Sequence, residues 1–240
     1  MLVIPAVDIM GGKCVRLVQG DPTRSKVYFD NPLEAARRLE VQGAELIHLI
    51  DLDAALDSGQ NLEAIEKILR KLRVKVQIGG GIRTLEKAET LLKLGASRVI
   101  FGTVAIQNPA LIQEAVRRYG SPRVAVAIDE RKGRVTFHGW KDQSAIDYLD
   151  LASSFEEMKV GTIIFTSTSV DGTLKGPQVE KIRKLVETVR VQVIASGGVS
   201  SLNDLVMLAG TGVNGVVVGT ALYEERFTLE QAIEVVKNVG

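Results

Sequence analysis

The stretch Gln77-Ile78-Gly79-Gly80-Gly81-Ile82-Arg83 runs from apolar residues into a glycine-rich turn, and Ile194-Ala195-Ser196-Gly197-Gly198-Val199 does the same later in the chain. Gly80 and Gly197 are 117 residues apart in a chain of 240. At this offset Leu85, Leu91, Gly95, Val99, Gly102 and Thr103 align with Leu202, Leu208, Gly212, Val216, Gly219 and Thr220, and Gly59 aligns with Gly176. Self-similarity at a fixed period indicates a repeated architecture, and glycines recur where the backbone turns sharply or approaches another group. The sequence therefore predicts two similar halves, about residues 1–120 and 121–240.

Short runs rich in Val and Ile alternate with segments of helical period, which is typical of βα units around a parallel sheet. Eight strands are predicted near residues 2–8, 45–51, 75–79, 98–102, 123–129, 161–166, 191–196 and 215–219. Asn31-Pro32 and Gly43, Thr84 and Gly95, and Asn108-Pro109 and Gly120 are predicted to bracket three of the helices. The pattern favours the α/β class and a (β/α)₈ TIM barrel formed by residues 1–240 as a single domain from two half-barrels. Two ordinary domains are compatible with the length, whereas a flavodoxin-like or doubly wound sheet usually needs fewer strands.

Charge and cysteine content restrict the classes of partner. The chain has 30 Lys and Arg against 29 Asp and Glu, so no global field attracts nucleic acid or an anionic membrane. Its one cysteine, Cys14, excludes an internal disulfide framework and a cysteine-rich zinc or iron–sulfur site. The first residues read as a strand and not as a signal peptide, and no stretch reaches membrane-spanning length. We expect a cytoplasmic protein that acts as a monomer.

The glycine-rich turns predict two phosphate-binding cradles. Backbone N–H groups beside a helix N-terminus bind phosphate without needing Lys or Arg, and barrels of this type carry such loops at the C-terminal ends of their strands. The first cradle comprises Gly80, Gly81, Gly102 and Thr103, and the second comprises Gly197, Gly198, Gly219 and Thr220. The glycines could instead serve only tight turns. Their paired occurrence on opposite sides of one barrel mouth predicts a long ligand that is phosphorylated at both ends.

Two aspartates are predicted to face each other across the same mouth. Asp8 ends the first strand and Asp129 ends the fifth, which are equivalent strands of the two halves. Alternation along each strand places both carboxylates on the side opposite the larger branched residues. One such residue alone could be a helix cap or half of an ion pair. Two at symmetric positions can remove a carbon-bound proton and protonate a sugar ring oxygen, which is general acid–base catalysis.

These segments together resemble the phosphoribosylformimino-aminoimidazole carboxamide ribotide isomerase family of histidine biosynthesis, the ProFAR isomerases, over nearly the whole chain. The resemblance rests on Pro5-Ala6-Val7-Asp8, Gly12-Lys13-Cys14-Val15-Arg16-Leu17, Gln19-Gly20-Asp21, His48-Leu49-Ile50-Asp51-Leu52-Asp53, Gly79-Gly80-Gly81-Ile82-Arg83, Gly139-Trp140, Asp171-Gly172-Thr173 with Gly176, and Ser196-Gly197-Gly198. It implies an Amadori rearrangement that uses neither a metal nor an organic cofactor. The implied partner is a small bisphosphorylated substrate, with no role for nucleic acid or a membrane.

The resemblance also implies roles for single residues. Asp8 would be the base at C2′, Asp129 the acid at the ring oxygen, and Thr166 a hydroxyl that orients the ribose. Arg16, Arg83 and Gly172 match ligand-binding positions, and Trp140 could stack on the imidazole carboxamide or simply pack within its loop. A lone strand histidine is more often structural, so His48 is left outside the catalytic set. Asp51 is expected to face the mouth with an unspecified electrostatic role.

Three positions depart from the family pattern, and three other functions stay open. Ser167 stands where the family often has Asp, and Val170 and Thr220 each stand where Arg is common. The sister cyclase, imidazole glycerol phosphate synthase, fits less well because this chain has Ala6-Val7-Asp8 where that family tends to have Cys-Leu-Asp. A bifunctional isomerase that also takes phosphoribosylanthranilate is an alternative. A non-catalytic phosphosugar-binding barrel would keep the glycines yet would not need opposed acids.

Overall fold

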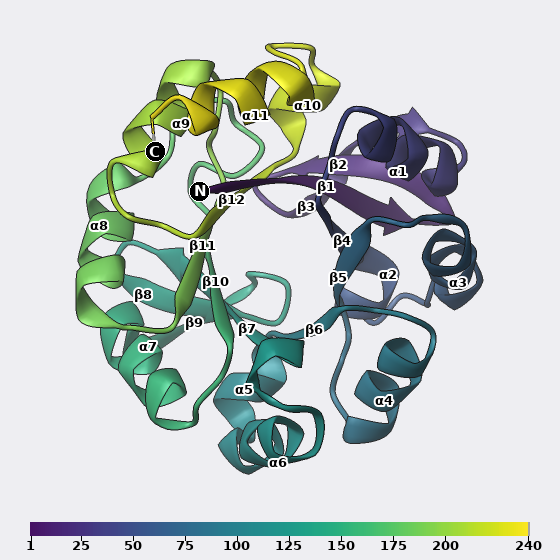
Figure 1. Ribbon diagram of the computed structural model, residues 1–240. Helices are drawn as coiled ribbons and strands as arrows, with labels where there is room; N and C mark the ends of the chain where they lie inside the picture. The colour runs from purple at the N-terminus through teal and green to yellow at the C-terminus, as the bar shows by residue number, and fades with distance from the viewer. Residues whose placement is uncertain (240) are drawn as a thin grey trace.

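The computed structural model describes residues 1–239 and shows a closed barrel of eight parallel strands surrounded by helices (Figure 1). The barrel strands in chain order are β1 (Leu2–Met10), β4 (Leu46–Asp51), β5 (Lys75–Gly79), β6 (Arg98–Phe101), β7 (Val124–Arg131), β10 (Thr162–Ser167), β11 (Gln192–Ser196) and β12 (Gly215–Val218). Each pairs in parallel with the next, and pairing of β12 with β1 closes the ring. The predicted (β/α)₈ barrel and its eight strands are confirmed.

Helices follow the barrel strands, and the three helices whose ends were predicted lie within those bounds. Among the described residues they are α1 (Pro32–Val41), α2 (Leu52–Ala55), α3 (Leu62–Lys71), α4 (Leu85–Lys93), α5 (Thr103–Gln107), α6 (Pro109–Tyr119), α7 (Tyr148–Glu157), α8 (Val179–Thr188), α9 (Leu202–Ala209), α10 (Thr220–Tyr223) and α11 (Leu229–Lys237), with a 3₁₀ turn, η1, over Ser121–Arg123. The side chains of Asn31, Thr84 and Asn108 accept hydrogen bonds from the first turns of α1, α4 and α6. All three predicted N-caps are therefore present.

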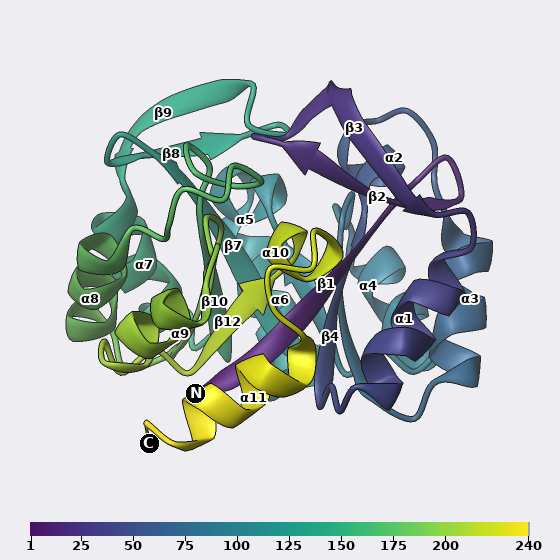
Figure 2. The same ribbon diagram turned by 90° about the horizontal axis from the view of Figure 1, so that it is seen from above.

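Four additional strands were not predicted, and they form two hairpins over the mouth of the barrel. β2 (Lys13–Val18) and β3 (Asp21–Phe29) follow β1, whereas β8 (Arg134–Phe137) and β9 (Asp142–Asp147) follow β7. Figure 2 shows both hairpins on one side of the barrel, away from the end where the N-terminus lies. Since β1 and β7 are equivalent strands of the two halves, the hairpins occupy equivalent loops.

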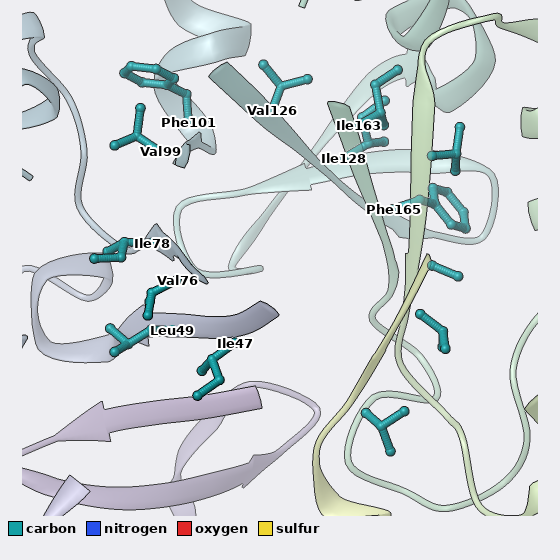
Figure 3. Packing of buried hydrophobic residues seen from close by; sticks show 14 of the residues in the cluster. Ile47, Leu49, Val76, Ile78, Val99, Phe101, Val126, Ile128, Ile163 and Phe165 are labelled. Atoms are coloured by element: carbon teal, nitrogen blue, oxygen red, sulfur yellow. The ribbon is translucent and has the colours of Figure 1, made fainter. Parts of the chain in front are cut away.

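The core has two layers, as expected for a barrel. The larger cluster lies between the strands and the helices, where Ile47, Leu49, Val126, Ile128 and Phe165 pack (Figure 3). A smaller cluster fills the barrel interior: Ile4, Ala6, Leu46, Ile100, Ala125, Ile164, Ile194 and Val217. The alternation predicted for β1 and β7 is therefore correct, because Ala6 and Ala125 lie inside and their neighbours lie outside.

The repeated glycines of the two halves adopt matching backbone conformations. Gly80 and Gly197 have φ of 99° and 92°, in the left-handed region that favours glycine. Gly102 and Gly219 are the N-caps of α5 and α10, with φ/ψ of −96°/−112° and −113°/−95°. The sequence repeat thus corresponds to a repeat of backbone geometry at the loops that surround the mouth.

Candidate functional site

Every residue predicted for the site lines one of two adjoining cavities at the C-terminal ends of the strands. The larger, of about 230 Å³, is lined by Asp8, Arg16, Gly80, Gly81, Arg83, Gly102, Thr103, Asp129, Trp140 and Thr166. The smaller, of about 20 Å³, is lined by Arg16, Gly172, Gly197, Gly198, Gly219 and Thr220. The first set of glycine-rich loops therefore lies in the larger cavity and the second set in the smaller one, and Arg16 borders both.

The first recess lies where the β5 and β6 loops meet the N-terminus of α5. Added Cβ atoms at Gly80 and Gly81 would overlap the carbonyl oxygens of Asp51 and Ala54, so no other residue fits these positions without moving the backbone. Thr103 is the first residue of α5, and its hydroxyl accepts a hydrogen bond from the His138 backbone N–H at 3.0 Å. This recess therefore offers backbone amides together with a hydroxyl that is already tied to the second hairpin.

The second recess likewise combines glycine-rich loops with a threonine hydroxyl, and a buried cation, Arg16, borders it. A Cβ atom at Gly219 would overlap the Arg16 guanidinium, which therefore lies directly against the β12 loop. Two polar atoms around this recess are buried and have no hydrogen-bond partner among the described residues: Nε of Arg16 and Oγ1 of Thr220. Unpaired buried donors are costly, so both groups are available to an anion in the recess.

Asp8 and Arg16 form a buried ion pair between the two recesses. Arg16 Nη1 lies 2.6 Å from Asp8 Oδ2, and the two side chains are only 10% and 13% exposed. Burial raises the pKa of Asp8, while the positive charge and hydrogen bond of Arg16 oppose that rise. The Asp8 charge in turn raises the pKa of Arg16 against its own desolvation. The Asp8 carboxyl therefore lies directly beside a cation that also borders the second recess.

Asp129 lies across the mouth on β7, where no neighbouring cation within residues 1–239 offsets the cost of burying its negative charge. Burial raises its pKa to about 6, although hydrogen bonds from the side chains of Trp140 and Thr166 act in the opposite direction. Thr166 is its register partner on the neighbouring strand β10. Because no cation is paired with Asp129 among the described residues, this carboxyl holds a proton more readily than a surface aspartate does.

Asp171 is a third buried carboxyl in the mouth, and our interpretation of the sequence missed it as a site residue. It borders both cavities, and burial raises its pKa to about 6, with Arg16 lowering it and Asp8 raising it. Asp171 lies in a loop after β10, where strand alternation does not predict the direction in which a side chain points. The only sequence signal was its membership of the Asp171-Gly172-Thr173 motif.

The hairpins bring further predicted residues over the mouth. Trp140 packs against Gly20, where an added Cβ would overlap its ring, so one part of the indole is already covered by the first hairpin. Gly172 packs against the same hairpin, at the Leu17 carbonyl oxygen. Arg83 lies at the rim, where its guanidinium pairs with Asp57 at 2.9 Å. A stacking role for Trp140 and a phosphate-binding role for Arg83 remain predictions.

Asp51 does not face the mouth, and the expectation of an electrostatic role there was wrong. Its carboxylate is 1% exposed and caps α2 by accepting a hydrogen bond from the Ala54 N–H at 3.1 Å. It also accepts hydrogen bonds from the backbone and side chain of Asn61. Asp51 therefore fixes the loop after β4. His48, by contrast, lines the larger cavity.

The three departures from the family pattern lie in different places. Val170 packs against Gly198, and Thr220 borders the second recess. The Ser167 side chain is buried, with its hydroxyl unpartnered, and lines neither cavity. Among residues 1–239, Arg16 is consequently the only cationic side chain that lines the second recess.

We predict that Gly219→Ala destabilises the protein more than the equivalent change Gly102→Ala. The two glycines have similar backbone angles, so the backbone strain is the same in both variants. Only the Cβ at position 219 meets another group, the Arg16 guanidinium, while the one at 102 meets nothing within 4 Å. Urea unfolding without ligand should show Gly219→Ala less stable by about 1–3 kcal/mol, the cost of disturbing a buried charged hydrogen bond. Equal stabilities would contradict this description of Arg16.

No group of three or more His, Cys, Asp or Glu side chains among residues 1–239 is arranged to hold a metal ion. No helix in that range combines the length and the apolar character needed to cross a membrane.

Comparison with known proteins relates this geometry to a family. Residues 2–228 match the family described as histidine biosynthesis protein. Relatives from Methanothermobacter thermautotrophicus and Methanosphaera stadtmanae are 47% and 44% identical over 234 residues, covering 98% of this chain and 98% and 99% of theirs. A Methanosarcina acetivorans relative is 47% identical over 98% of both chains. All three are named 1-(5-phosphoribosyl)-5-((5-phosphoribosylamino)methylideneamino) imidazole-4-carboxamide isomerase, which is the systematic name of ProFAR isomerase. Because the matched region spans nearly the whole chain, this protein belongs to the histidine biosynthesis protein family.

Proposed function

We propose that this protein is an aldose–ketose isomerase that converts ProFAR to its phosphoribulosyl isomer by a cofactor-free Amadori rearrangement. The observation that carries the proposal is that Asp8 and Asp129 line the same cavity as the first set of glycine-rich loops, and that the cavity formed by the second set adjoins it. A molecule with a phosphate at each end would have its central sugar beside these two carboxyls. The names of the full-length relatives support the same reaction.

The two carboxyls suit the two proton transfers of this reaction. In the first proposed step, Asp129 gives its proton to the ring oxygen as the C1′–O bond breaks, which leaves an open-chain iminium. Asp8 then takes the proton from C2′, and the electron pair of that C–H bond neutralises the iminium to give an enolamine. Reprotonation at C1′ and loss of the enol proton yield the ketose, so the net change is an isomerisation. Each proton transfer is worth typically about 10²–10⁴ in rate.

The surrounding residues have supporting roles in this proposal. Thr166 and Trp140 orient the Asp129 carboxyl, and Arg16 holds Asp8 while it also faces the phosphate in the second recess. Gly172 lets the loop after β10 approach the first hairpin closely. Since every proposed residue comes from one chain, a monomer suffices for the mechanism. We further infer that the barrel is one domain of two half-barrels, because the glycine conformations repeat between its halves.

A direct assay tests the proposal. We expect the purified protein to convert ProFAR with a spectroscopic change that follows the rearrangement, in buffer that contains a chelator. The same preparation assayed with phosphoribosylanthranilate determines whether the smaller aminoaldose is also accepted. Tight binding of ProFAR without turnover would replace the isomerase by a phosphosugar-binding barrel. Formation of imidazole glycerol phosphate from the isomerised product and ammonia, without isomerisation of ProFAR, would replace it by the cyclase.

A further inference from the structure

A row of buried polar side chains crosses the barrel interior beneath the two aspartates. His48 on β4 is the register partner of Gln77 on β5, and Gln77 is the register partner of Arg98 on β6. Gln77 is fully buried, and His48 is 8% exposed. Arg98 lies at the start of its strand, far from the mouth, whereas His48 lines the larger cavity with Asp8. The row therefore connects the floor of the barrel to the proposed substrate site.

Arg98 determines which way the Gln77 amide is turned. Both Nε and Nη2 of Arg98 donate hydrogen bonds to Gln77 Oε1, the first at 3.1 Å. Because a guanidinium has donors and no acceptor, only the amide oxygen can face it. The Arg98 side chain is itself held by Thr162, whose hydroxyl accepts a hydrogen bond from Nη1 at 2.5 Å. The NH₂ group of Gln77 must then point the other way, towards His48.

The orientation of Gln77 in turn determines the tautomer of His48. Gln77 Nε2 lies 2.7 Å from His48 Nδ1, and since this amide nitrogen can only donate, Nδ1 must accept and carry no proton. Burial lowers the pKa of His48 to about 3, so the ring is neutral and its one proton is on Nε2. Nε2 has no hydrogen-bond partner among the described residues, yet it is absent from their fully buried unpaired atoms. It is therefore open to the cavity that His48 lines.

We propose that Arg98, acting through Gln77, holds His48 as the neutral Nε2–H tautomer, so that His48 donates a hydrogen bond to an oxygen of the bound sugar. Arg98 and Gln77 are positioning residues, and His48 touches the substrate. The position one interior layer below Asp8 suits this role, because Ala6 is the register partner of His48 and Asp8 is the next inward residue of β1. The catalytic consequence rests on the proposed isomerase function, whereas the tautomer does not.

Nitrogen-15 NMR of the imidazoles tests the tautomer directly. The chain contains two histidines, so His138→Gln assigns the His48 signals by elimination. In mildly alkaline buffer the unmodified protein should show a protonated Nε2 and an unprotonated Nδ1. Observation of the Nδ1–H form would overturn the proposal without the need for any variant in the network.

The variant Gln77→Glu inverts the tautomer with little change in shape. A carboxylate at position 77 still accepts from Arg98, but towards His48 it can only accept, so the imidazole proton should move to Nδ1 and leave Nε2 as an acceptor. We expect the NMR spectrum to show a protonated Nδ1 and an unprotonated Nε2. We also expect kcat/KM for ProFAR to fall at least about tenfold, since the sugar oxygen then meets the lone pair of Nε2 where it had met a donor. Gln192→Glu is the control because the Gln192 side chain accepts a hydrogen bond from Thr162 at the far end of the row, and a carboxylate there can still accept it.

The outcomes separate this inference from the proposed function. A switched tautomer with unchanged kinetics would overturn the donor role of His48. A protein that turns over neither ProFAR nor phosphoribosylanthranilate would refute the isomerase function, while the tautomer measurement would still decide the role of Arg98 and Gln77. Loss of activity in Gln192→Glu equal to that in Gln77→Glu would also overturn the inference, because the charge alone would then account for the effect.

Discussion

Asp8→Asn and Asp129→Asn should each lower kcat for ProFAR by about 10²–10⁴-fold while leaving ligand affinity nearly intact. An amide has nearly the same shape as a carboxylate but neither removes a carbon-bound proton nor donates an acidic one. The phosphates would still bind to the backbone amides of the two sets of glycine-rich loops, to which neither carboxyl group contributes. Steady-state kinetics with calorimetric titration of the product measures both quantities. Asp142→Asn, at an exposed carboxylate of the second hairpin that pairs with His138, is the control.

The pH dependence distinguishes the two roles. An acid must be protonated to act, and the pKa of Asp129 is raised to about 6, so the active fraction should fall as the pH rises above about 6. A base must be ionised, so protonation of Asp8 should reduce activity at the acidic end. The profile of kcat/KM should therefore be bell-shaped, and the residual activity of Asp129→Asn should lack the decline on the alkaline side.

Asp171 provides the competing assignment. The pKa of its carboxyl is also raised to about 6, and it lies near both Asp8 and Arg16. If Asp171→Asn removes the alkaline decline while Asp129→Asn keeps it, Asp171 is the acid and our assignment of Asp129 is wrong. Full loss of product affinity in Asp8→Asn or Asp129→Asn, with turnover preserved at saturation, would contradict catalytic roles for both.

Gly198→Ala should be the most damaging substitution for the stability of the second recess. A Cβ atom there would overlap the Gly176 carbonyl oxygen and lie 2.9 Å from Val170 Cγ2, and the φ of 87° is strained for alanine. Backbone cannot move away as a flexible side chain can. We expect the free energy of unfolding to fall by about 3–5 kcal/mol, the range of severe core substitutions. Denaturant unfolding measures this loss.

Gly212→Ala separates backbone strain from the close approach. Gly212 has a nearly identical φ of 80°, but an added Cβ would only reach ordinary contact with Val186 at 3.6 Å. The free energy of unfolding of Gly212→Ala should therefore fall only by the left-handed backbone strain, about 1–2 kcal/mol. If both variants lose the same stability, the contact between the loops after β10 and β11 is looser than the structure indicates.

The barrel could be predicted because its signals are periodic and repeated. Alternation in β1 and β7 distinguishes two faces, and the glycines at a fixed offset reveal equivalent loops. The same kind of alternation in β4 predicts the direction of the Asp51 side chain. Leu46 faces the interior and Ile50 packs against the interior cluster, so Asp51 has the opposite parity and must point towards the helices. The strand period, and not the family motif, determines the direction of the Asp51 side chain.

The hairpins and Asp171 could not be predicted in the same way. β9 has exposed and half-buried residues without a clear alternation, because it pairs only at the rim of the barrel. The direction of Asp171 depends on backbone contacts between loops that are far apart in the chain. The Gln19 N–H, for instance, donates to the Asp171 carbonyl oxygen at 3.0 Å. The tautomer of His48 likewise depends on Arg98, 50 positions later in the sequence, and no local pattern contains that information.

The contacts of the first hairpin restrict how the mouth of the barrel can open. Besides the Gln19 backbone contact, its side chain donates to the Ser169 carbonyl oxygen at 2.8 Å, and Gly20 touches Trp140. The first hairpin thus contacts two segments from the second half of the chain, the loop after β10 and Trp140 of the second hairpin. A movement of the first hairpin away from the mouth would therefore break contacts with both segments at once.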